Sequence, residues 1–426
     1  MEKIIINIEN FLFGTPLMVV LLFTHIFFTI KLKFPQRKIF KALNIELRRS
    51  NKKGEITPFK SLMTVLAGTL GTGNIIGIAS AIIIGGVGSL FWIFVSGFLA
   101  IATKYAETFI VLKYRKKYEK KYIGGAMYIL DEVMDKKKIA KIFSVFLIFS
   151  TLTMGAMMQS NSISSTILNN YVIDKKIIGI LITILVGYIV FGNEKRIAKV
   201  SSILVPIATI LYLVSCIMLL FVFRKNIVNS VLLIIHEAFN FKSLAGGILG
   251  SCVLTSLREG LNKGLFTNES GLGTSPLFDV NVETDDIYKQ SLISASSVFI
   301  DTVVLCSITG ILFVSSGLYL YIIDPGMLAI EMFSLIPFGE SLLMFFLSIF
   351  AFSTIPCSCY YGWRAVDYLF KDRKICEVIY KIVYLVFVFI GCNTNIDIVF
   401  RLATIANIGL MIPNIYMIFT LRKEIK

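Results

Sequence analysis

The stretch Gly68–Ser80, "GTLGTGNIIGIAS", places four glycines and one asparagine inside an otherwise apolar run. It is not a phosphate-binding loop, because it reads G-x-G-x-x-x-G, one residue longer than the dinucleotide fingerprint, and the chain contains no G-x-x-x-x-G-K-[ST] motif. Close helix packing explains the glycines but not the polar neighbours Thr69, Thr72 and Asn74. A transmembrane helix that is interrupted where it lines a binding site explains both.

The composition is too apolar for a soluble protein. Of the 426 residues, 56% are hydrophobic and 16% charged, whereas soluble domains average about 25% charged. Apolar runs of roughly twenty residues, the length that crosses a bilayer as a helix, recur along the chain. We predict about eleven transmembrane helices, at residues 11–33, 61–85, 87–112, 140–167, 177–191, 199–223, 243–262, 290–321, 340–362, 376–391 and 397–420. A twelfth stays open at "SVLLIIHEAF", Ser230–Phe239, which we interpret as an interfacial helix.

The net charge of +15 is concentrated in the connecting segments. The basic runs are "KLKFPQRKIFKALNIELRRSNKK", "KYRKKYEKK", "NEKRIAK", "FKDRK" and "LRKEIK". If these segments are cytoplasmic, the chain follows the positive-inside rule. We therefore predict a multi-pass protein of the cell (inner) membrane with its N-terminus outside and its C-terminus in the cytoplasm. The charge indicates attraction to anionic membrane lipid rather than to nucleic acid.

Cysteine and histidine usage argues against metal or hydrolytic chemistry. The seven cysteines lie mostly within predicted spans, and none has the spacing of a metal site. We interpret Cys357 and Cys359 as buried small side chains. The only histidines are His25 and His236. We expect no enzymatic activity and no cofactor. The first apolar run is long enough to span and precedes a basic segment, so we expect no cleavable signal peptide.

A second glycine-rich span lies at residues 241–260, "FKSLAGGILGSCVLTSLREG", with glycines at 246, 247 and 250. Its first four residues repeat "FKSL" at Phe59–Leu62, and the two spans run in opposite directions under the predicted topology. Interrupted helices of many transporters occur in such pairs, one in each inverted repeat. We predict an N-terminal helix with its basic segment at 1–60, a five-helix repeat at 61–223, and the interfacial helix with a second five-helix repeat at 224–426.

Several stretches resemble, in the same order, motifs of the alanine or glycine:cation symporter family. They are "GTGNIIGIASAI", "ATKYAE", "GGAMY", "MQSNS", "KGLFTNESGLGTSP", "IDTVVLCSITG" and "AFST…YYG". The resemblance implies a sodium-coupled importer of small neutral amino acids, with sodium as coupling ion. It also implies an all-α polytopic fold of the LeuT type, a 5+5 inverted repeat preceded by one extra helix. Substrate and sodium would then lie near the membrane midplane, between the two broken helices.

An amino acid in a low-dielectric site needs donors for its carboxylate and acceptors for its ammonium group. The unwound backbone of Gly71, Thr72 and Gly73 is suited to the carboxylate, and the Asn74 amide can donate or accept. Carbonyls of the second break are suited to the ammonium group, with candidates Gly247, Gly250 and Ser251. Gln159 makes either an interhelical hydrogen bond or, as the resemblance favours, a substrate contact.

Sodium prefers oxygen ligands, which hydroxyl side chains supply without added charge. By analogy with the fold, we expect a cation site at Thr69, Thr72, Ser353 and Thr354. A substrate contact is the alternative role for Thr354, and hydroxyls also bond to their own helix.

Polar groups on other spans are candidates for gating or coupling. Asp301 is a buried carboxylate with either a functional role or a structural hydrogen bond to the "TNES" segment. Asn268 and Glu269 indicate an inner gate or a helix cap. Lys104 and Glu107, three residues apart, predict a structural ion pair at the cytoplasmic end.

The sequence departs from the family at one pocket position. Where the family usually continues I-L-G-W-x-Y-Y-G, this chain reads "IPCSCYYG", so Ser358 replaces the tryptophan. Pro356 should also loosen the helix. We expect the smaller side chain to open the pocket to a larger or more polar amino acid. Ala126, where the family generally has proline, lies in a predicted cytoplasmic loop.

Three other classes of membrane protein are alternatives to a transporter: an enzyme, a channel and a sensor. A membrane enzyme predicts a catalytic cluster at one membrane face, and a channel predicts a continuous polar stripe. A sensor that binds amino acids without moving them stays open, as do proton coupling through Asp301 and the oligomeric state.

Overall fold

The computed structural model describes residues 15–48, 56–118, 121–168, 173–240, 250–284, 286–394 and 396–425. These residues are mostly helical. The first half contains α2 (Thr15–Lys31), η1 (Pro35–Lys38), α3 (Ile39–Arg48), α4 (Pro58–Thr69), η2 (Thr72–Asn74), α5 (Ile76–Gly85), α6 (Ser89–Tyr114), β1 (Lys116–Tyr118), β2 (Lys121–Ile123), α7 (Ala126–Tyr128), η3 (Ile129–Val133), α8 (Lys137–Ser150), η4 (Thr151–Met158), α9 (Gln159–Leu168), α10 (Lys175–Val190) and α11 (Glu194–Val222).

The second half contains α12 (Ile227–Ala238), α13 (Gly250–Asn268), α14 (Pro276–Asp279), α15 (Ile287–Val298), η5 (Phe299–Cys306), α16 (Ser307–Ser316), η6 (Leu318–Leu320), α17 (Pro325–Phe333), α18 (Gly339–Phe370), α19 (Lys374–Gly391), α20 (Ile396–Thr420) and η7 (Arg422–Glu424). The "SVLLIIHEAF" stretch is helical, as α12. The repeated "FKSL" at 241–244 and the glycines at 246 and 247 lie outside the described residues.

Six helical segments of the described chain are long and apolar enough to cross a membrane. They are Ser89–Tyr114, Lys137–Leu168, Glu194–Val222, Ile287–Ser316, Gly339–Phe370 and Val399–Thr420. A seventh counts if α2 and the following Pro35–Leu43, which are bent by 59°, form one span. The chain is therefore a multi-pass membrane protein.

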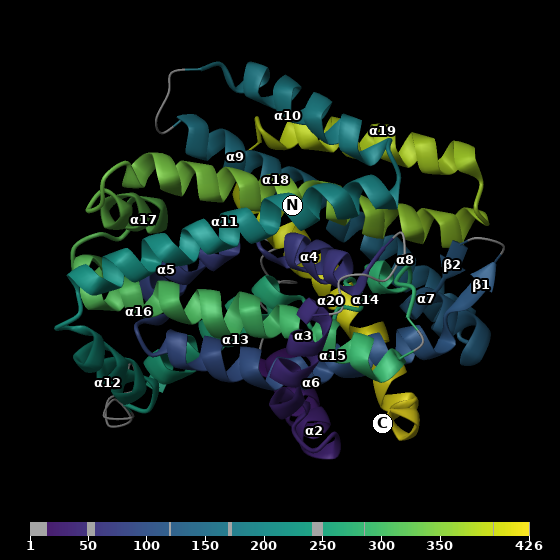
Figure 1. Ribbon diagram of the computed structural model, residues 1–426, viewed down its shortest axis with the longest axis horizontal. Helices are drawn as coiled ribbons and strands as arrows, with labels where there is room; N and C mark the ends of the chain where they lie inside the picture. The colour runs from purple at the N-terminus through teal and green to yellow at the C-terminus, as the bar shows by residue number, and fades with distance from the viewer. Residues whose placement is uncertain are drawn as a thin grey trace.

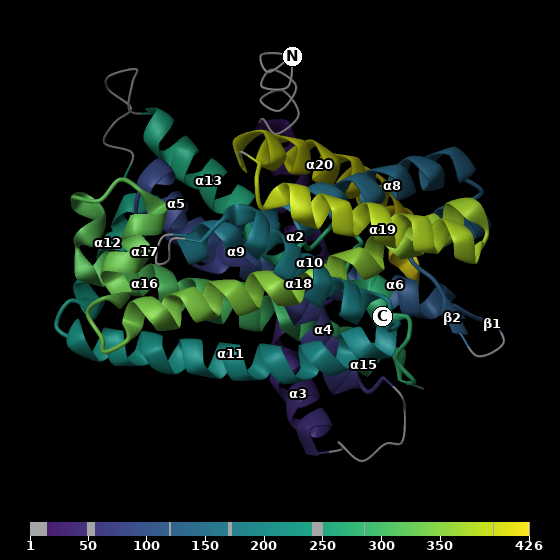
Figure 2. The same cartoon turned by 90° about the horizontal axis from the view of Figure 1, so that it is seen from above.

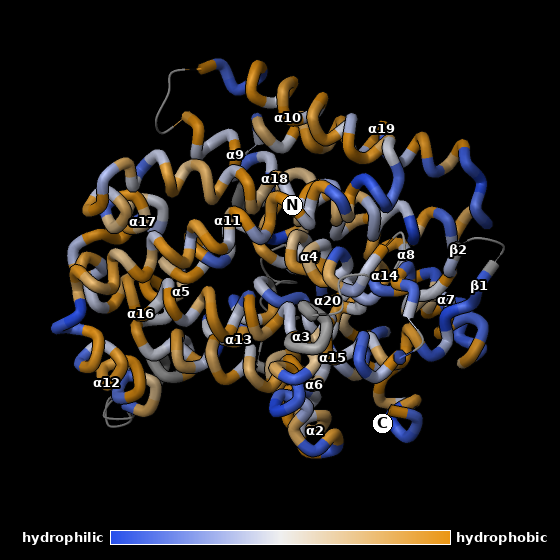
Figure 3. Tube along the Cα trace, viewed as in Figure 1, coloured by the Kyte–Doolittle hydropathy of each residue, from blue (hydrophilic) through white to orange (hydrophobic). Residues whose placement is uncertain are grey.

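The long helices run side by side in Figure 1, with α12 and α17 at one end of the bundle. The hairpin β1–β2 and α7 lie at the other end in Figure 1, and Figure 2 shows the hairpin opposite α12 and α17 from above. The hairpin pairs Lys117 with Tyr122 in an antiparallel register. Figure 3 shows apolar colours along the long helices and hydrophilic colours at the hairpin and the C-terminus.

The C-terminus is tied to the end of the bundle that carries the hairpin. Lys113 at the end of α6 donates to Glu424 at 2.7 Å, and the Tyr114 hydroxyl donates to the same carboxylate. These bonds, that of Lys113 above all, hold the pKa of the Glu424 carboxyl below its ordinary value. Basic segments that are distant in the sequence thus meet at one end of the molecule.

The predicted break in the first glycine-rich span is present. α4 begins at Pro58, after the Thr57 hydroxyl accepts a hydrogen bond from the Lys60 amide. It ends at Thr69, because Leu70 leaves the helical conformation and Gly71 is extended. A short turn, η2, follows before helix resumes as α5. Every residue of α4 from Ser61 onwards is buried, so the break lies inside the bundle.

Two of the spans that surround the break contain π-helical segments. η4 separates α8 from α9, and η5 separates α15 from α16. A π-helical turn inserts an extra residue into an α-helix and changes where the following side chains point, and such turns are frequent at functional sites. η4 ends directly before Gln159, and η5 contains Asp301.

Candidate functional site

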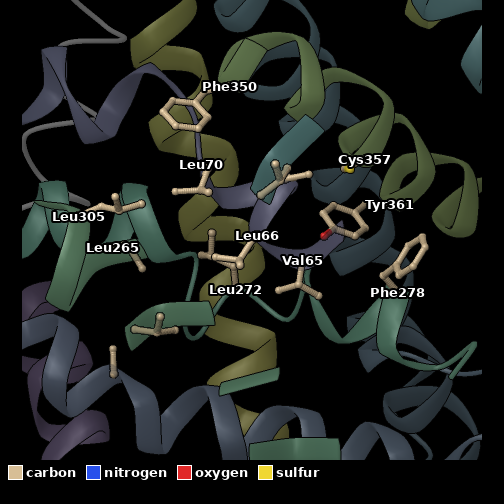
Figure 4. Close-up of a cluster of buried hydrophobic side chains, with 14 of the residues drawn as sticks. Val65, Leu66, Leu70, Leu265, Leu272, Phe278, Leu305, Phe350, Cys357 and Tyr361 are labelled. Atoms are coloured by element: carbon tan, nitrogen blue, oxygen red, sulfur yellow. The ribbon is translucent and has the colours of Figure 1, made fainter. Parts of the chain in front are cut away.

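The broken helix is joined to α18 through Thr354. Its hydroxyl lies 2.9 Å from the carbonyl oxygen of Ala67 and 3.3 Å from that of Leu70, the last carbonyls before the break. It also lies 2.9 Å from its own helix carbonyl at Phe350. Figure 4 shows Leu66 and Leu70 among the buried side chains that pack with Phe350 and Tyr361 of α18. The structure therefore brings Thr354 to the break, as the fold analogy predicted.

Gln159 of α9 lies directly against the unwound backbone. A Cβ atom at Gly71 would be 3.2 Å from Gln159 Oε1 and 3.3 Å from Nε2, so glycine allows this close approach. The Gln159 amide nitrogen is 3.4 Å from the Met154 carbonyl oxygen, which leaves its oxygen, Oε1, buried without a hydrogen-bond partner among the described residues. A buried carbonyl oxygen in this position is available to a ligand.

Asn74 contacts Asp301 of η5. Its Nδ2 atom donates to Asp301 Oδ1 at 2.5 Å, and the second carboxylate oxygen accepts from Thr302 at 2.8 Å. Asp301 is fully buried. Reversing the Asn74 amide would place its oxygen against the carboxylate, so the contact fixes its orientation. Asn74 Oδ1 is consequently a second buried oxygen without a hydrogen-bond partner in the described part of the chain.

This contact corrects one alternative for Asp301. A hydrogen bond to the "TNES" segment was considered from the sequence, but the two carboxylate oxygens accept from Asn74 and Thr302 instead. The sequence separation of 227 residues explains why no local pattern indicated it.

The remaining hydroxyls of the expected cation site are divided between the break and their own helices. Thr72 Oγ1 lies 3.3 Å from the Ser162 hydroxyl of α9, a neighbour that the sequence did not suggest. Thr69 donates to Leu66 of its own helix at 3.3 Å, and Ser353 donates to Phe350 at 2.9 Å. The Cβ position of Gly73 is 3.9 Å from the Thr267 methyl group, which brings α13 to the break.

Ser358 lies in a tight contact between α18 and η4. A Cβ atom at Gly155 would be only 2.3 Å from Ser358 Cβ, so the two helices meet here with almost no space between them. Pro356 lies inside α18, which continues through it. The expected opening of the pocket is therefore not visible at Ser358, because the close approach of Gly155 takes up the volume that a large side chain would need.

The second predicted break is described only in part. Gly247 lies outside the described residues, and Gly250 and Ser251 are the first residues of α13. α13 packs closely on α6, since a Cβ at Gly260 would be 2.6 Å from Trp92 Cβ and one at Gly264 would be 2.3 Å from Ser96 Oγ. Such small residues allow helices to approach in a membrane.

The predicted ion pair of Lys104 and Glu107 is confirmed, with 3.7 Å between Nζ and Oε1 and both side chains fully buried. Lys104 also donates to the Asn268 carbonyl at the end of α13. Glu107 Oε2 accepts from the backbone amides of Gly271 and Gly273, both at 3.2 Å. Both glycines have positive φ angles, of 95° and 73°.

Asn268 and Glu269 bond within the turn that follows α13. Asn268 Oδ1 accepts from the Ser270 amide at 2.9 Å, and Glu269 accepts from the Thr274 hydroxyl at 2.6 Å. This geometry is that of a helix cap, one of the two alternatives for these residues. A gating role stays a prediction.

Two further contacts of the first broken span escaped the sequence analysis. Ser61 of α4 donates to the buried Asp279 of α14 at 2.8 Å. A Cβ at Gly68 would be 2.9 Å from the Tyr361 hydroxyl oxygen, so glycine is required there for Tyr361 to pack on α4. The "YYG" motif was a sequence signal for Tyr361, whereas no motif pointed to Asp279.

The site offers neutral oxygens and one carboxylate rather than a transition-metal set. The described residues contain no group of three His, Cys, Asp or Glu side chains that could hold a metal ion. Cys357 and Cys359 are fully buried and unpaired, as expected from the sequence. Oxygen ligands of this kind suit a hard cation or an ammonium group.

A broken helix inside a bundle of membrane-spanning helices is the architecture of membrane proteins with the LeuT fold. The crystal structure of MhsT in complex with L-phenylalanine has this fold, with a TM-score of 0.58 and 14% identity. The match covers 85% of this chain and 88% of MhsT.

The family follows from comparison of the whole sequence. The model of the sodium:alanine symporter family matches residues 1–426. The sodium/alanine symporter AgcS of Methanococcus maripaludis is 32% identical over 96% of this chain and 92% of its own length. The probable sodium/glutamine symporter GlnT of Bacillus subtilis is 31% identical over 99% of this chain and 88% of its own length. The chain belongs to the sodium:alanine symporter family, a family of symporters.

Proposed function

We propose that this protein imports small neutral amino acids together with sodium by alternating access. The observation that carries the proposal is two buried oxygens that border the break, Asn74 Oδ1 and Gln159 Oε1. Neither has a hydrogen-bond partner within the described part of the chain. Each would cost stability if it stayed unpaired. An ammonium group or a cation satisfies them, which supports a site for an amino acid and its coupling ion.

In this proposal the backbone of Gly71, Thr72 and Gly73 receives the carboxylate, and Gln159 with Asn74 receives the ammonium group or the cation. The Thr354 hydroxyl lies beside the carbonyl oxygens of Ala67 and Leu70, and this group of three oxygens favours a bound sodium ion. Thr69, Thr72 and Ser353 would complete that site after small rotations of their hydroxyls.

The wider architecture belongs to the same proposal. We infer eleven transmembrane helices, with residues 61–223 and 224–426 as inverted five-helix repeats and residues 1–60 as the additional N-terminal part. The N-terminus lies outside, the C-terminus in the cytoplasm, and the protein in the cell (inner) membrane. The collection of basic segments at one end of the bundle supports this orientation.

Uptake into proteoliposomes tests the proposal. Purified protein is given labelled alanine, glycine and larger amino acids under an imposed sodium gradient and, separately, a proton gradient. We expect a sodium gradient to drive accumulation of alanine or glycine. Uptake indifferent to both gradients would contradict symport, and binding without accumulation would identify a sensor.

A second candidate is a symporter for a larger or more polar amino acid, or one coupled to protons. The name of the relative GlnT favours a polar substrate, and the buried Asp301 carboxylate favours a proton route. The tight Gly155–Ser358 contact argues against extra pocket volume at Ser358.

The Ser358→Trp variant tests whether Ser358 determines the size of the amino acid that is transported. Because Gly155 leaves little space, we expect the indole to force α18 and η4 apart, at a cost of about 1–3 kcal/mol of stability. If Ser358 borders the substrate, the variant should also lose uptake of the larger amino acids. An unchanged substrate size profile in a folded variant would remove Ser358 from the pocket. Gly155→Ala, which overpacks the same contact, is the matched control for stability.

A further inference from the structure

The connection between α2 and α4 carries an unusual surface. Within Lys33–Ala42, which we term the basic segment, four residues are buried: Pro35, Gln36, Ile39 and Ala42. The six exposed residues are four cations and two phenylalanines: Lys33, Phe34, Arg37, Lys38, Phe40 and Lys41. Phe34 is 40% exposed and Phe40 62%. The segment contains no acidic residue.

This surface is held in place by the backbone and by one buried amide. Lys33 and Phe34 both have left-handed φ angles, of 54° and 58°, which produce the bend between α2 and η1. Gln36 Nε2 then donates to the Phe98 carbonyl of α6 at 3.0 Å and to the Thr29 hydroxyl at 3.2 Å. The exposed residues are therefore presented outwards from an anchored segment, and Figure 2 shows α3 protruding from the bundle.

The cations are not neutralised within the protein. In the parts of the chain that the structure describes, no carboxylate forms an ion pair with Lys33, Arg37, Lys38 or Lys41. Arg37 lies over the Phe34 ring and Lys38 over the Tyr288 ring of α15, both at 5.3 Å. The contact with Tyr288 places Lys38 against the start of α15.

We propose that anionic phospholipids of the cytoplasmic leaflet bind to the basic segment. Cations beside exposed aromatic side chains are the composition of a surface that lies in the headgroup region, with the rings towards the acyl chains and the charges towards phosphates. Each Lys or Arg near an anionic leaflet contributes attraction, and four lie within nine residues here. Inorganic phosphate offers the same charge but no apolar partner for Phe34 and Phe40.

Bound lipid would act on the transport site through η5. The Phe40 ring meets that of Phe299, the first residue of η5, with 5.0 Å between centroids. Asp301, which fixes Asn74, follows two residues later. Lipid that holds Phe40 in place thus steadies the start of the π-helical segment. This step rests on the proposed function, whereas the lipid binding does not.

Lipid retention tests the binding. The full-length protein is purified in detergent and titrated with phosphatidylglycerol or phosphatidylcholine, and bound lipid is counted by native mass spectrometry. The variant K33Q/R37Q/K38Q/K41Q removes the four charges. Its matched control, K136Q/K137Q/K138Q/K141Q, removes four exposed lysines around the start of α8. We expect phosphatidylglycerol to bind the first variant at least about tenfold more weakly, and the control to change by less than about twofold.

An equal loss of phosphatidylglycerol binding in both quadruple variants would show a general charge effect and overturn the proposal. Unchanged phosphatidylglycerol binding in both would also overturn it. Displacement of the lipid by inorganic phosphate or single-stranded DNA at matched ionic strength would also overturn it. F34S/F40S keeps every charge and should weaken phosphatidylglycerol binding as well. Transport in vesicles with and without phosphatidylglycerol is measured separately, so absent transport contradicts the proposed function while the lipid counts still decide the binding.

Discussion

The first broken span bonds to a buried aspartate at two places, near its start and at its break, but the two contacts differ in what they leave unpaired. At the α14 end, Asp279 accepts from Ser61 at 2.8 Å, from Gln290 at 3.0 Å and from Ser294 at 2.5 Å. At the break, Asp301 accepts from Asn74, whose own carbonyl oxygen has no hydrogen-bond partner among the residues that the structure describes. The Asp279 contact joins helices, whereas the Asp301 contact orients the Asn74 carbonyl oxygen towards a ligand.

The largest expected effect is that of Asn74→Ala. It removes the unpaired oxygen and the donor of Asp301 together, so we expect substrate or sodium to bind about a hundredfold more weakly. Isothermal titration or a scintillation proximity assay would measure this. Asn161→Ala is the control, because that amide donates to Gly391 and Thr394 away from the break. Retained affinity in a folded Asn74→Ala protein would place the site elsewhere.

Exchanging each aspartate for asparagine should separate the two contacts. Asp301→Asn replaces the carboxyl group that orients Asn74, so the sodium concentration for half-maximal uptake should rise about tenfold. Asp279→Asn should lower stability by about 1–3 kcal/mol with little change in that concentration. Uptake and thermal unfolding are measured on both variants. If Asp279→Asn shifts the sodium dependence as much as Asp301→Asn does, the proposed difference between the Ser61–Asp279 and Asn74–Asp301 contacts is wrong.

The smallest expected effect is that of Ser61→Ala. Asp279 keeps Gln290 and Ser294 as donors, so the loss should be about 1 kcal/mol of stability. Substrate affinity should stay within about twofold of the wild type. A large loss of affinity would show that the Ser61–Asp279 contact takes part in binding rather than only joining helices.

The sequence was sufficient for features that depend on local pattern. Glycines and polar residues in one apolar run predicted the break, and a spacing of three predicted the Lys104–Glu107 pair. The position of Thr354 beside the break came from the resemblance. The Asn74–Asp301 bond joins residues 227 apart, and no local pattern reports such a distance. The Gly155–Ser358 contact depends on how closely two helices pack, which residue types alone do not determine.

The π-helical segment η4 has a consequence for how variants of this protein should be compared. Converting η4 into ordinary α-helix without removing a residue would rotate everything after it by about 100°. Gln159 and Ser162 would both turn away from the break, although neither had been substituted. The length of residues 151–158 is therefore as much a determinant of the site as the residues that touch it. A relative whose segment forms ordinary α-helix would keep the side chains of its "QSNS" motif pointing the same way only if the segment were one residue shorter.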